Sequence, residues 1–304
     1  MTINRTMQIV LASAGLCCLF LLPACTTATD IGTRVGQAAG VLDARQAEGI
    51  RRTAERTERS FEDFTPEQEY FLGRSVAAQV LDRYPVYDDE QTNGYISLIG
   101  QSLAVFSDRP DIFAGYSFQI LDSEELNAFA TPGGHVFVTL GMLRLARNED
   151  EVAAILAHEI AHITEAHGLQ SIRTARITGA LTSAAITGVY LTGSREVAEL
   201  TDIFSDSIDD MSRTLFTSGY SRTSEREADR IAVTILRRAG YSPHALVTLL
   251  QHMGEHWNPQ GRGYARTHPS PLDRMQDVQD VLDDEDPRIP EQRIARFQHY
   301  LGGL

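Results

Sequence analysis

Lysine is absent from this 304-residue sequence, so all 27 basic side chains are arginine. This absence excludes a Walker-type lysine, a Schiff-base lysine and any other chemistry that needs an ammonium group. Positive charge is also in short supply, because 41 acidic residues leave a formal net charge of −14. A charge of this sign repels phosphate backbones, so we expect no binding to nucleic acid.

Cysteine is scarce as well, and its three positions, Cys17, Cys18 and Cys25, lie close to the N-terminus. They fall within or just after an uncharged apolar run, residues 7–22, that follows Arg5. Such a run is typical of a secretory signal and is short for a membrane-spanning helix. We therefore expect an exported protein whose folded part contains no disulfide.

The signal ends in Leu-Pro-Ala-Cys, which resembles the bacterial lipobox, whose cysteine is lipidated and becomes the first mature residue. We expect residues 1–24 to be a lipoprotein signal peptide and Cys25 to anchor the protein to a membrane; a plain cleaved signal is the alternative. Thr26 follows Cys25, where an aspartate would resemble an inner-membrane retention signal. The expected location is the periplasm, at the inner leaflet of the outer membrane.

The rest of the chain divides by the distribution of its apolar residues. Residues 25–62 have little apolar periodicity and are expected to form a tether, and residues 286–304 are expected to form a polar C-terminal tail. The folded domain is expected over residues 63–285. Within it, residues 177–194 are uncharged and rich in Gly, Ala and Thr, which favours a helical lid over a cleft. A membrane-inserted hairpin is the alternative for this segment.

Helical periodicity dominates the domain. Helices are predicted over residues 66–81 after the cap Thr65, over 90–106, after the capping box of Asn148 and Glu151, on either side of Gly240, and over 270–282. Residues 116–121 and 135–140 alternate polar and apolar side chains and predict a small antiparallel sheet. The fold class is therefore α+β and mostly helical.

The stretch HEIAH places His158 and His162 four residues apart, with Glu159 beside the first histidine. On a helix, residues at this spacing are rotated by about 40° from one another, so both imidazoles can hold one zinc ion. Glu159 lies one step round the helix, where it can reach a water on that ion and act as acid and base.

A catalytic zinc needs a third protein ligand and one open position. The metzincin pattern requires glycine and histidine where this chain has Glu165 and Gly168, so that subclass is excluded. His167 lies about 140° from His162 on a continued helix and is expected to face solvent.

A glutamate on a later helix is the remaining candidate for the third ligand. In SEREADR, Glu225 and Asp229 are four residues apart, so one carboxylate can bind metal while the other accepts a hydrogen bond from a ligand imidazole. The alternative is a solvated helix face beside Arg222, Arg226 and Arg230.

Four stretches together resemble a known family of zinc metallopeptidases. In order they are NAFATPGGHVFVTLGML, HEIAH, EREAD and THPSP. The family includes the CAAX prenyl endopeptidase, the heat-shock protease HtpX and, most similar to this chain, the periplasmic BepA-like proteins. The resemblance covers residues from about 64 to 282 and implies a gluzincin-like peptidase domain. It implies that Zn²⁺ is held by His158, His162 and Glu225, that Glu159 is the catalytic acid/base, and that Asp229 supports a ligand.

The resemblance also implies how substrates bind and how the enzyme is held inactive. The strand in GGHVFVTLG resembles the edge strand that lines the cleft and pairs with an extended substrate, which suits unfolded or misassembled outer-membrane proteins. His268 of THPSP matches a histidine that can approach the metal and displace its water. The alternatives for His268 are a hydrogen-bonded loop residue and a stabiliser of the oxyanion.

One departure and two rival functions complete the interpretation. BepA-like proteins continue into tetratricopeptide repeats, whereas about 20 residues follow the last predicted helix here, fewer than one ~34-residue repeat. The main rival to a protease is a lipid-anchored chaperone or assembly factor with a latent zinc site. A zinc amidase would require a different ligand pattern.

Overall fold

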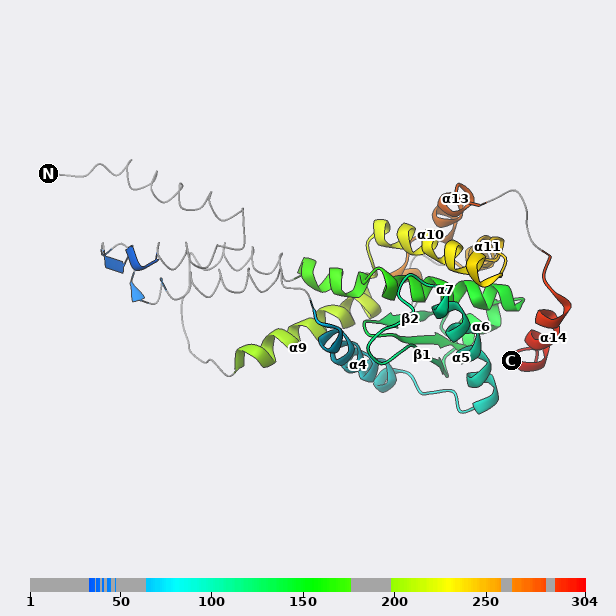
Figure 1. Ribbon diagram of the computed structural model, residues 1–304, viewed down its shortest axis with the longest axis horizontal. Coiled ribbons are helices and arrows are strands. Elements are labelled where there is room, and N and C mark those ends of the chain that lie inside the picture. Colours follow the sequence, from blue (N-terminus) through cyan, green and yellow to red (C-terminus); the bar gives the residue numbers. More distant parts are fainter. Residues whose placement is uncertain are drawn as a thin grey trace. The chain divides into compact units, whose positions relative to one another are not determined.

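The computed structural model describes residues 64–175, 198–257, 264–282 and 288–304, and a few positions between 33 and 47 (Figure 1). The chain divides into two units, one of residues 1–63 and 173–199 and the other of residues 64–172 and 200–304. The second unit holds nearly all described residues. The signal peptide, Cys25 and the segment 177–194 lie outside the described residues, as does most of the tether.

Helices make up most of the second unit, as the sequence predicts. They are α4 (Pro66–Arg83), α5 (Glu90–Val105), α6 (Leu140–Leu145), α7 (Glu149–Thr164), α9 (Ala198–Arg213), α10 (Arg222–Ala239), α11 (His244–Glu255), α12 (Tyr264–Thr267), α13 (Pro271–Gln279) and α14 (Glu291–Tyr300), with a π-helix, η2 (Thr214–Ser218). The predicted caps are present in part, because Asn148 and Glu151 form only half of the expected capping box and the Glu151 side chain accepts from the Arg147 N–H instead. Thr65 and Gln68 form a reciprocal capping box at α4, the Asn148 side chain accepts from the Glu151 N–H, and α10 ends at Gly240 in the left-handed conformation.

The sheet has three strands, β1 (Ser117–Leu121), β2 (Ala128–Thr131) and β3 (His135–Thr139), in the order β1-β3-β2. It is mixed, because β3 pairs in parallel with β1 and antiparallel with β2. The predicted purely antiparallel sheet is therefore wrong. The expected edge strand, β3, is also wrong, since it is the central strand and is paired on both sides.

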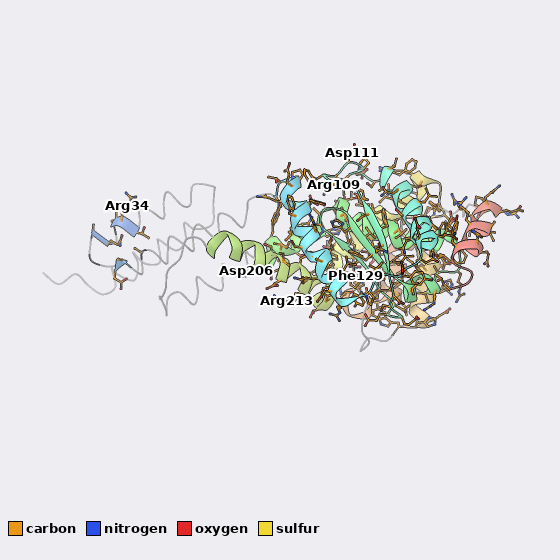
Figure 2. All side chains as sticks on the ribbon, turned by 90° about the horizontal axis from the view of Figure 1, so that it is seen from below. Arg34, Arg109, Asp111, Phe129, Asp206 and Arg213 are labelled. Atoms are coloured by element: carbon orange, nitrogen blue, oxygen red, sulfur yellow. The ribbon has the colours of Figure 1, made fainter. Side chains whose placement is uncertain are left out.

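Both predictions fail for the same reason, which is that the sequence pattern does not indicate β2 as a strand. All of its residues are buried, so it shows no polar–apolar alternation. Phe129, for example, is 2% exposed and contacts the rings of Tyr84 and Phe216 inside the body of the unit (Figure 2). With β2 recognised, the turn after it joins β2 to β3 as a hairpin, and β2 takes the edge position.

Helix α7 runs through the middle of the unit. It contacts β2 and β3 on one side and α5, α10 and α11 around the rest of its surface (Figure 1). Every one of its 16 residues is buried, including the charged ones. The motif HEIAH is therefore carried by the most enclosed helix of the unit, where side chains have few alternative positions.

The first turn of α7 carries buried acids that arginines of α14 neutralise. Arg296 donates to both carboxylate oxygens of Glu149, at 2.9 and 2.5 Å, and Arg293 donates to both oxygens of Asp150. Phe297 of α14 joins the main core. Part of the expected polar tail is thus a helix packed against α5 and α7. The sequence hides this role because the buried partners of its arginines are about 150 residues away.

A glycine in α4 allows that helix to lie against the β2–β3 turn. A Cβ atom added to Gly73 would lie 1.5 Å from the carbonyl oxygen of Pro132. We expect Gly73→Ala to lower the free energy of unfolding by on the order of 3 kcal/mol, because two backbones must separate. Gly94→Ala is the matched control, since nothing lies within 4 Å of its added Cβ, and it should raise stability by about 1 kcal/mol. Urea denaturation of both variants would measure this, and equal midpoints would contradict it.

Candidate metal centre

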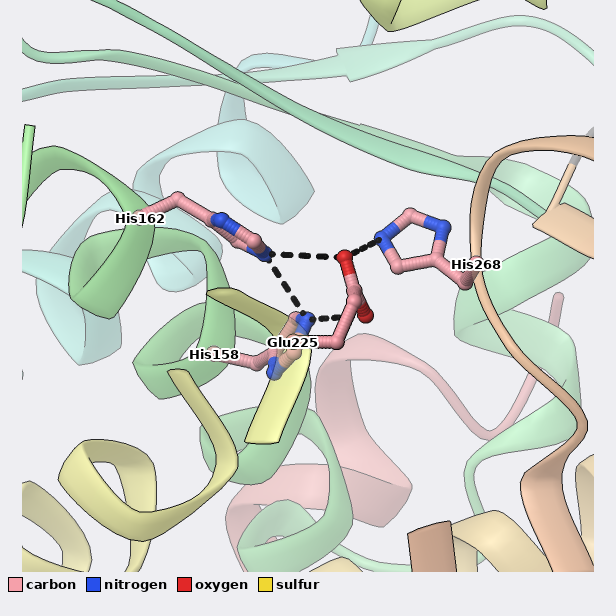
Figure 3. Close-up of side chains that lie close together, drawn as sticks. All are labelled: His158, His162, Glu225 and His268. Carbon is pink, nitrogen blue, oxygen red and sulfur yellow. Dashed lines mark hydrogen bonds and ion pairs between the residues drawn. The ribbon is translucent and has the colours of Figure 1, made fainter. Parts of the chain in front are cut away.

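Four side chains from three parts of the chain converge at one point of the unit. One ligand atom each from His158, His162, Glu225 and His268 lies within 4.8 Å of all the others (Figure 3). The Nε2 atoms of His158 and His162 are 3.1 Å apart, close to the ~3.3 Å expected of two nitrogens on one tetrahedral zinc ion. The carboxylate of Glu225 lies between the imidazoles, at 3.7 Å from His158 Nε2 and 3.5 Å from His162 Nε2.

Packed helices hold these side chains in place. His158 and His162 project from one face of α7, as their spacing predicts, and Glu225 lies in the first turn of α10, which packs along α7. Ser221 fixes the start of α10, because its hydroxyl accepts from the Ser224 N–H. His268 follows α12, and its Nε2 lies 3.7 Å from Glu225 Oε1.

The electrostatics of the cluster suit a cation. Both carboxylate oxygens of Glu225 are buried without a hydrogen-bond partner among the described residues. Burial raises the pKa of Glu225 well above its usual range and lowers the pKa values of the three imidazoles, leaving their nitrogen lone pairs available. A divalent metal ion among these atoms would pair with the carboxylate and favour its ionised form. The residues therefore fit a metal ion with three or four protein ligands.

Asp229 supports His158 from the side away from this centre. His158 Nδ1 lies 3.0 Å from Asp229 Oδ1, so the imidazole can donate there and turn Nε2 toward the metal position. Arg274 holds the same carboxylate with two hydrogen bonds, at 2.9 and 2.5 Å. Burial alone would raise the pKa of Asp229, but the Arg274 guanidinium and the His158 hydrogen bond hold it well below its usual range.

Glu159 lies beside the cluster with little around it to neutralise its charge. Its side chain and that of His158 line a small, mostly apolar cavity with Ala128, Leu249, Met253 and Tyr264. Burial raises the pKa of Glu159 to about 8, against a lowering effect of Arg274. A carboxyl group with a pKa near neutrality can both accept and return a proton.

His167 is buried beside the four-residue cluster. The prediction that it faces solvent is therefore wrong. His167 is 1% exposed, and its Nδ1 lies 3.0 Å from Nδ1 of His162. The expected angle assumed that α7 continues to His167. The helix instead ends at Thr164, and Ala166, with φ 53°, interrupts it for two residues before the chain is helical again over residues 167–175. This interruption places His167 against His162.

Three further side chains of the site were missed from the sequence. Arg274 lies in the predicted helix after THPSP, but nothing in its spacing indicates Asp229 as its partner. The Tyr220 ring stacks on His162 with centroids 4.2 Å apart, and the Tyr264 ring stacks on His268 at 3.7 Å. Only Tyr264 had a local signal, because it lies four residues before His268.

Two histidines on a HEXXH helix, a glutamate from a second helix and an adjacent buried glutamate are the arrangement of a metallopeptidase centre. The comparison with known families agrees with this class. Residues 90–282 match peptidase family M48. The chain therefore belongs to peptidase family M48.

Curated relatives are about a quarter identical to the chain over the residues that align. It is 28% identical to the putative beta-barrel assembly-enhancing protease of Vibrio cholerae, over 70% of this chain and 44% of that protein. Identity to the beta-barrel assembly-enhancing protease of Escherichia coli is 27%, over 73% and 45% of the two chains. Identity to the mitochondrial metalloendopeptidase OMA1 of Schizosaccharomyces pombe is 27%, over 78% and 66%. The chain thus spans less than half the length of the two assembly-enhancing proteases. Among its described residues, no helix is both long enough and apolar enough to cross a bilayer.

Proposed function

We propose that the protein is a zinc-dependent endopeptidase of the bacterial cell envelope that cleaves unfolded or misassembled outer-membrane proteins. The observation that carries the proposal is the buried Glu225 carboxylate, which has no hydrogen-bond partner among the described residues and faces the Nε2 atoms of His158 and His162, with Glu159 beside them. The names of the assembly-enhancing relatives support envelope proteins as substrates. Lipidation of Cys25 would place the domain at the inner leaflet of the outer membrane.

The chain's own residues divide the chemistry between them. His158, His162 and Glu225 would hold the zinc ion, which when bound supplies Lewis acidity toward water and the scissile carbonyl. Glu159 would take a proton from the attacking water and return it to the leaving amine. Asp229 keeps His158 in the tautomer whose Nε2 is free to bind metal.

The edge strand β2 is the segment suited to an extended substrate. The Thr139 N–H donates to the Asn127 carbonyl, so by alternation the backbone groups of Ala128 and Ala130 point away from β3. A peptide could add to the sheet there, beside the metal centre, and this pairing reads backbone more than side chains. Broad specificity for unfolded chains follows.

The segment that carries His268 closes both the metal centre and this edge. The Tyr264 N–H donates to the carbonyl of Leu126 just before β2, and the Tyr264 side chain lines the same cavity as Ala128. His268 meanwhile supplies a fourth ligand atom, a nitrogen, to the cluster. We infer that this is a self-inhibited arrangement, which must open before a substrate can reach β2.

Removal of metal tests the function directly. The purified protein should cleave unfolded casein, lose this activity on dialysis against a chelator, and regain it when one equivalent of zinc is added. Metal content by atomic absorption and the rate of casein cleavage are the two measurements. Cleavage that continues in fully metal-free protein would contradict the proposal.

A chaperone or assembly factor remains the second candidate, because His268 completes a four-ligand set of the kind found in structural zinc sites. It would suppress aggregation of an unfolded outer-membrane protein without cleaving it. An aggregation assay beside the casein assay separates the two functions.

Substitution of His268 tests self-inhibition. His268→Ala should raise the rate of casein cleavage several-fold, because the position opposite the three other ligands becomes open to water and substrate. His299→Ala is the control, since His299 is an exposed histidine on α14, and it should leave the rate unchanged. An unchanged or lower rate in His268→Ala would remove the latch and favour a role for His268 in catalysis.

A further inference from the structure

The two metal-facing histidines of α7 are supported by different chemistry. His158 Nδ1 lies 3.0 Å from a carboxylate oxygen of Asp229, which is itself fixed by Arg274. No carboxylate contacts the corresponding Nδ1 of His162 among the described residues. Its neighbour is instead the Nδ1 atom of His167, at 3.0 Å, and His167 Nε2 lies 3.3 Å from Glu227 Oε2.

We propose that His167 and Glu227 are positioning residues that hold His162 in the tautomer and orientation needed to bind zinc, an inference that rests on the proposed function. A neutral imidazole carries one proton, so His162 can offer Nε2 to a metal only when its proton is on Nδ1. That proton needs an acceptor. The only group within hydrogen-bond distance of it among the described residues is Nδ1 of His167.

The hydrogen-bond directions are then determined along the whole chain of groups. If His167 accepts at Nδ1, its own proton must be on Nε2. Nε2–H then donates to Glu227, a carboxylate that can only accept. The hydrogen bonds then run in one direction, from His162 to His167 and from His167 to Glu227. The Glu227 side chain lies at the surface and is 49% exposed.

Neighbouring rings restrict the rotation of the His162 side chain. Tyr220 stacks on one face with an interplanar angle of 19°, and His167 contacts the ring edge. The break in the helix at Ala166 comes directly before His167, which contacts His162. The next residue, Gly168, fits because it has no side chain, since an added Cβ would lie 3.0 Å from the side chains of Pro132 and Met211. The local backbone conformation therefore places the His167 imidazole beside His162.

A small set of variants separates positioning from simple space filling. His167→Leu introduces an apolar side chain of similar bulk and removes both the acceptor for His162 and the donor to Glu227. His167→Asn places an oxygen near the position of the lost Nδ1 atom and so restores an acceptor. Glu227→Gln keeps an acceptor for His167, whereas Glu227→Ala removes it without touching the buried core.

The readout is the zinc dissociation constant, measured by competition with a chromogenic chelator on the full chain. We expect His167→Leu to weaken zinc binding by about 10- to 100-fold, and Glu227→Ala to weaken it less. His167→Asn and Glu227→Gln should both bind zinc within about threefold of wild type. Thermal unfolding of the metal-free proteins shows whether each variant is folded.

Two results would overturn the inference. One is wild-type zinc affinity in both His167→Leu and Glu227→Ala. The other is equal weakening in His167→Leu and His167→Asn, which would show that only shape matters. Failure of the proposed function looks different. If neither wild type nor His268→Ala cleaves casein although both bind zinc, the protease is contradicted and the affinity series stays decisive. Wild-type protein that binds no zinc would overturn both.

Discussion

The Glu159→Gln protein is expected to cleave casein at less than about one-thousandth of the wild-type rate while keeping its zinc. General acid–base catalysis contributes about 10²- to 10⁴-fold, and glutamine can neither accept nor return the proton. Zinc should stay, because the ligand atoms belong to His158, His162 and Glu225 and none of them is changed. Metal analysis and initial rates on the same preparation measure both parts of the prediction.

The folded structure should tolerate this substitution unusually well for a buried charged position. Glu159 is 2% exposed, and burial already raises its pKa to about 8, so the metal-free protein holds mostly the neutral acid at pH 7. Glutamine has nearly the same shape and no charge, so the metal-free variant should unfold at a temperature equal to or above that of wild type. Glu165→Gln, at the half-buried residue that follows α7, is the matched control and should keep full activity. Substantial cleavage by zinc-loaded Glu159→Gln would assign the proton transfer to another group.

Arg274→Met is expected to cause the largest loss of stability, about 3–5 kcal/mol in the metal-free protein. Arg274 is 2% exposed and makes two hydrogen bonds to Asp229, while its Nη1 lies 3.8 Å from Glu225 Oε2. Without it, two buried carboxylates share the site with no cation. Zinc should recover part of the loss, because the ion neutralises Glu225. Urea denaturation with zinc and with a chelator measures both values.

Two further variants sharpen this test. Arg230→Met removes an exposed arginine from α10 and should change stability by less than about 0.5 kcal/mol. The double variant Asp229→Asn with Arg274→Met removes both partners of the pair, so it should be more stable than Arg274→Met alone. If Arg274→Met unfolds at the wild-type urea concentration, the buried charges are compensated by other groups.

The parts of the site that could be predicted are those set by the helix period. His158 and His162 share a face because they are four residues apart, and the same spacing places Glu225 and Asp229 together on α10. The family resemblance then joined the two helices. The predicted caps and most helix positions depend on contacts within a few residues, which the sequence shows directly.

The missing parts depend on contacts that no local pattern encodes. His167 was assigned to solvent because nothing in the letters TEAHG shows that Ala166 adopts φ 53° and ends the helix. Arg274 pairs with Asp229 across 45 positions, and β2 is a strand only because β3 pairs with it. Each is set by tertiary packing, which overrides local propensity.

The arginines of α14 also bear on how the nascent protein matures. Glu149 and Arg296 are 147 positions apart, so a ribosome completes the histidine-bearing helix long before it makes the counter-charges for its first turn. Burying those acids without their arginine partners costs several kcal/mol per ion, so α7 gains its full stability in the interior only when α14 is in place. We therefore expect removal of residues 288–304 to loosen the helix that carries HEIAH, and with it the four-residue cluster.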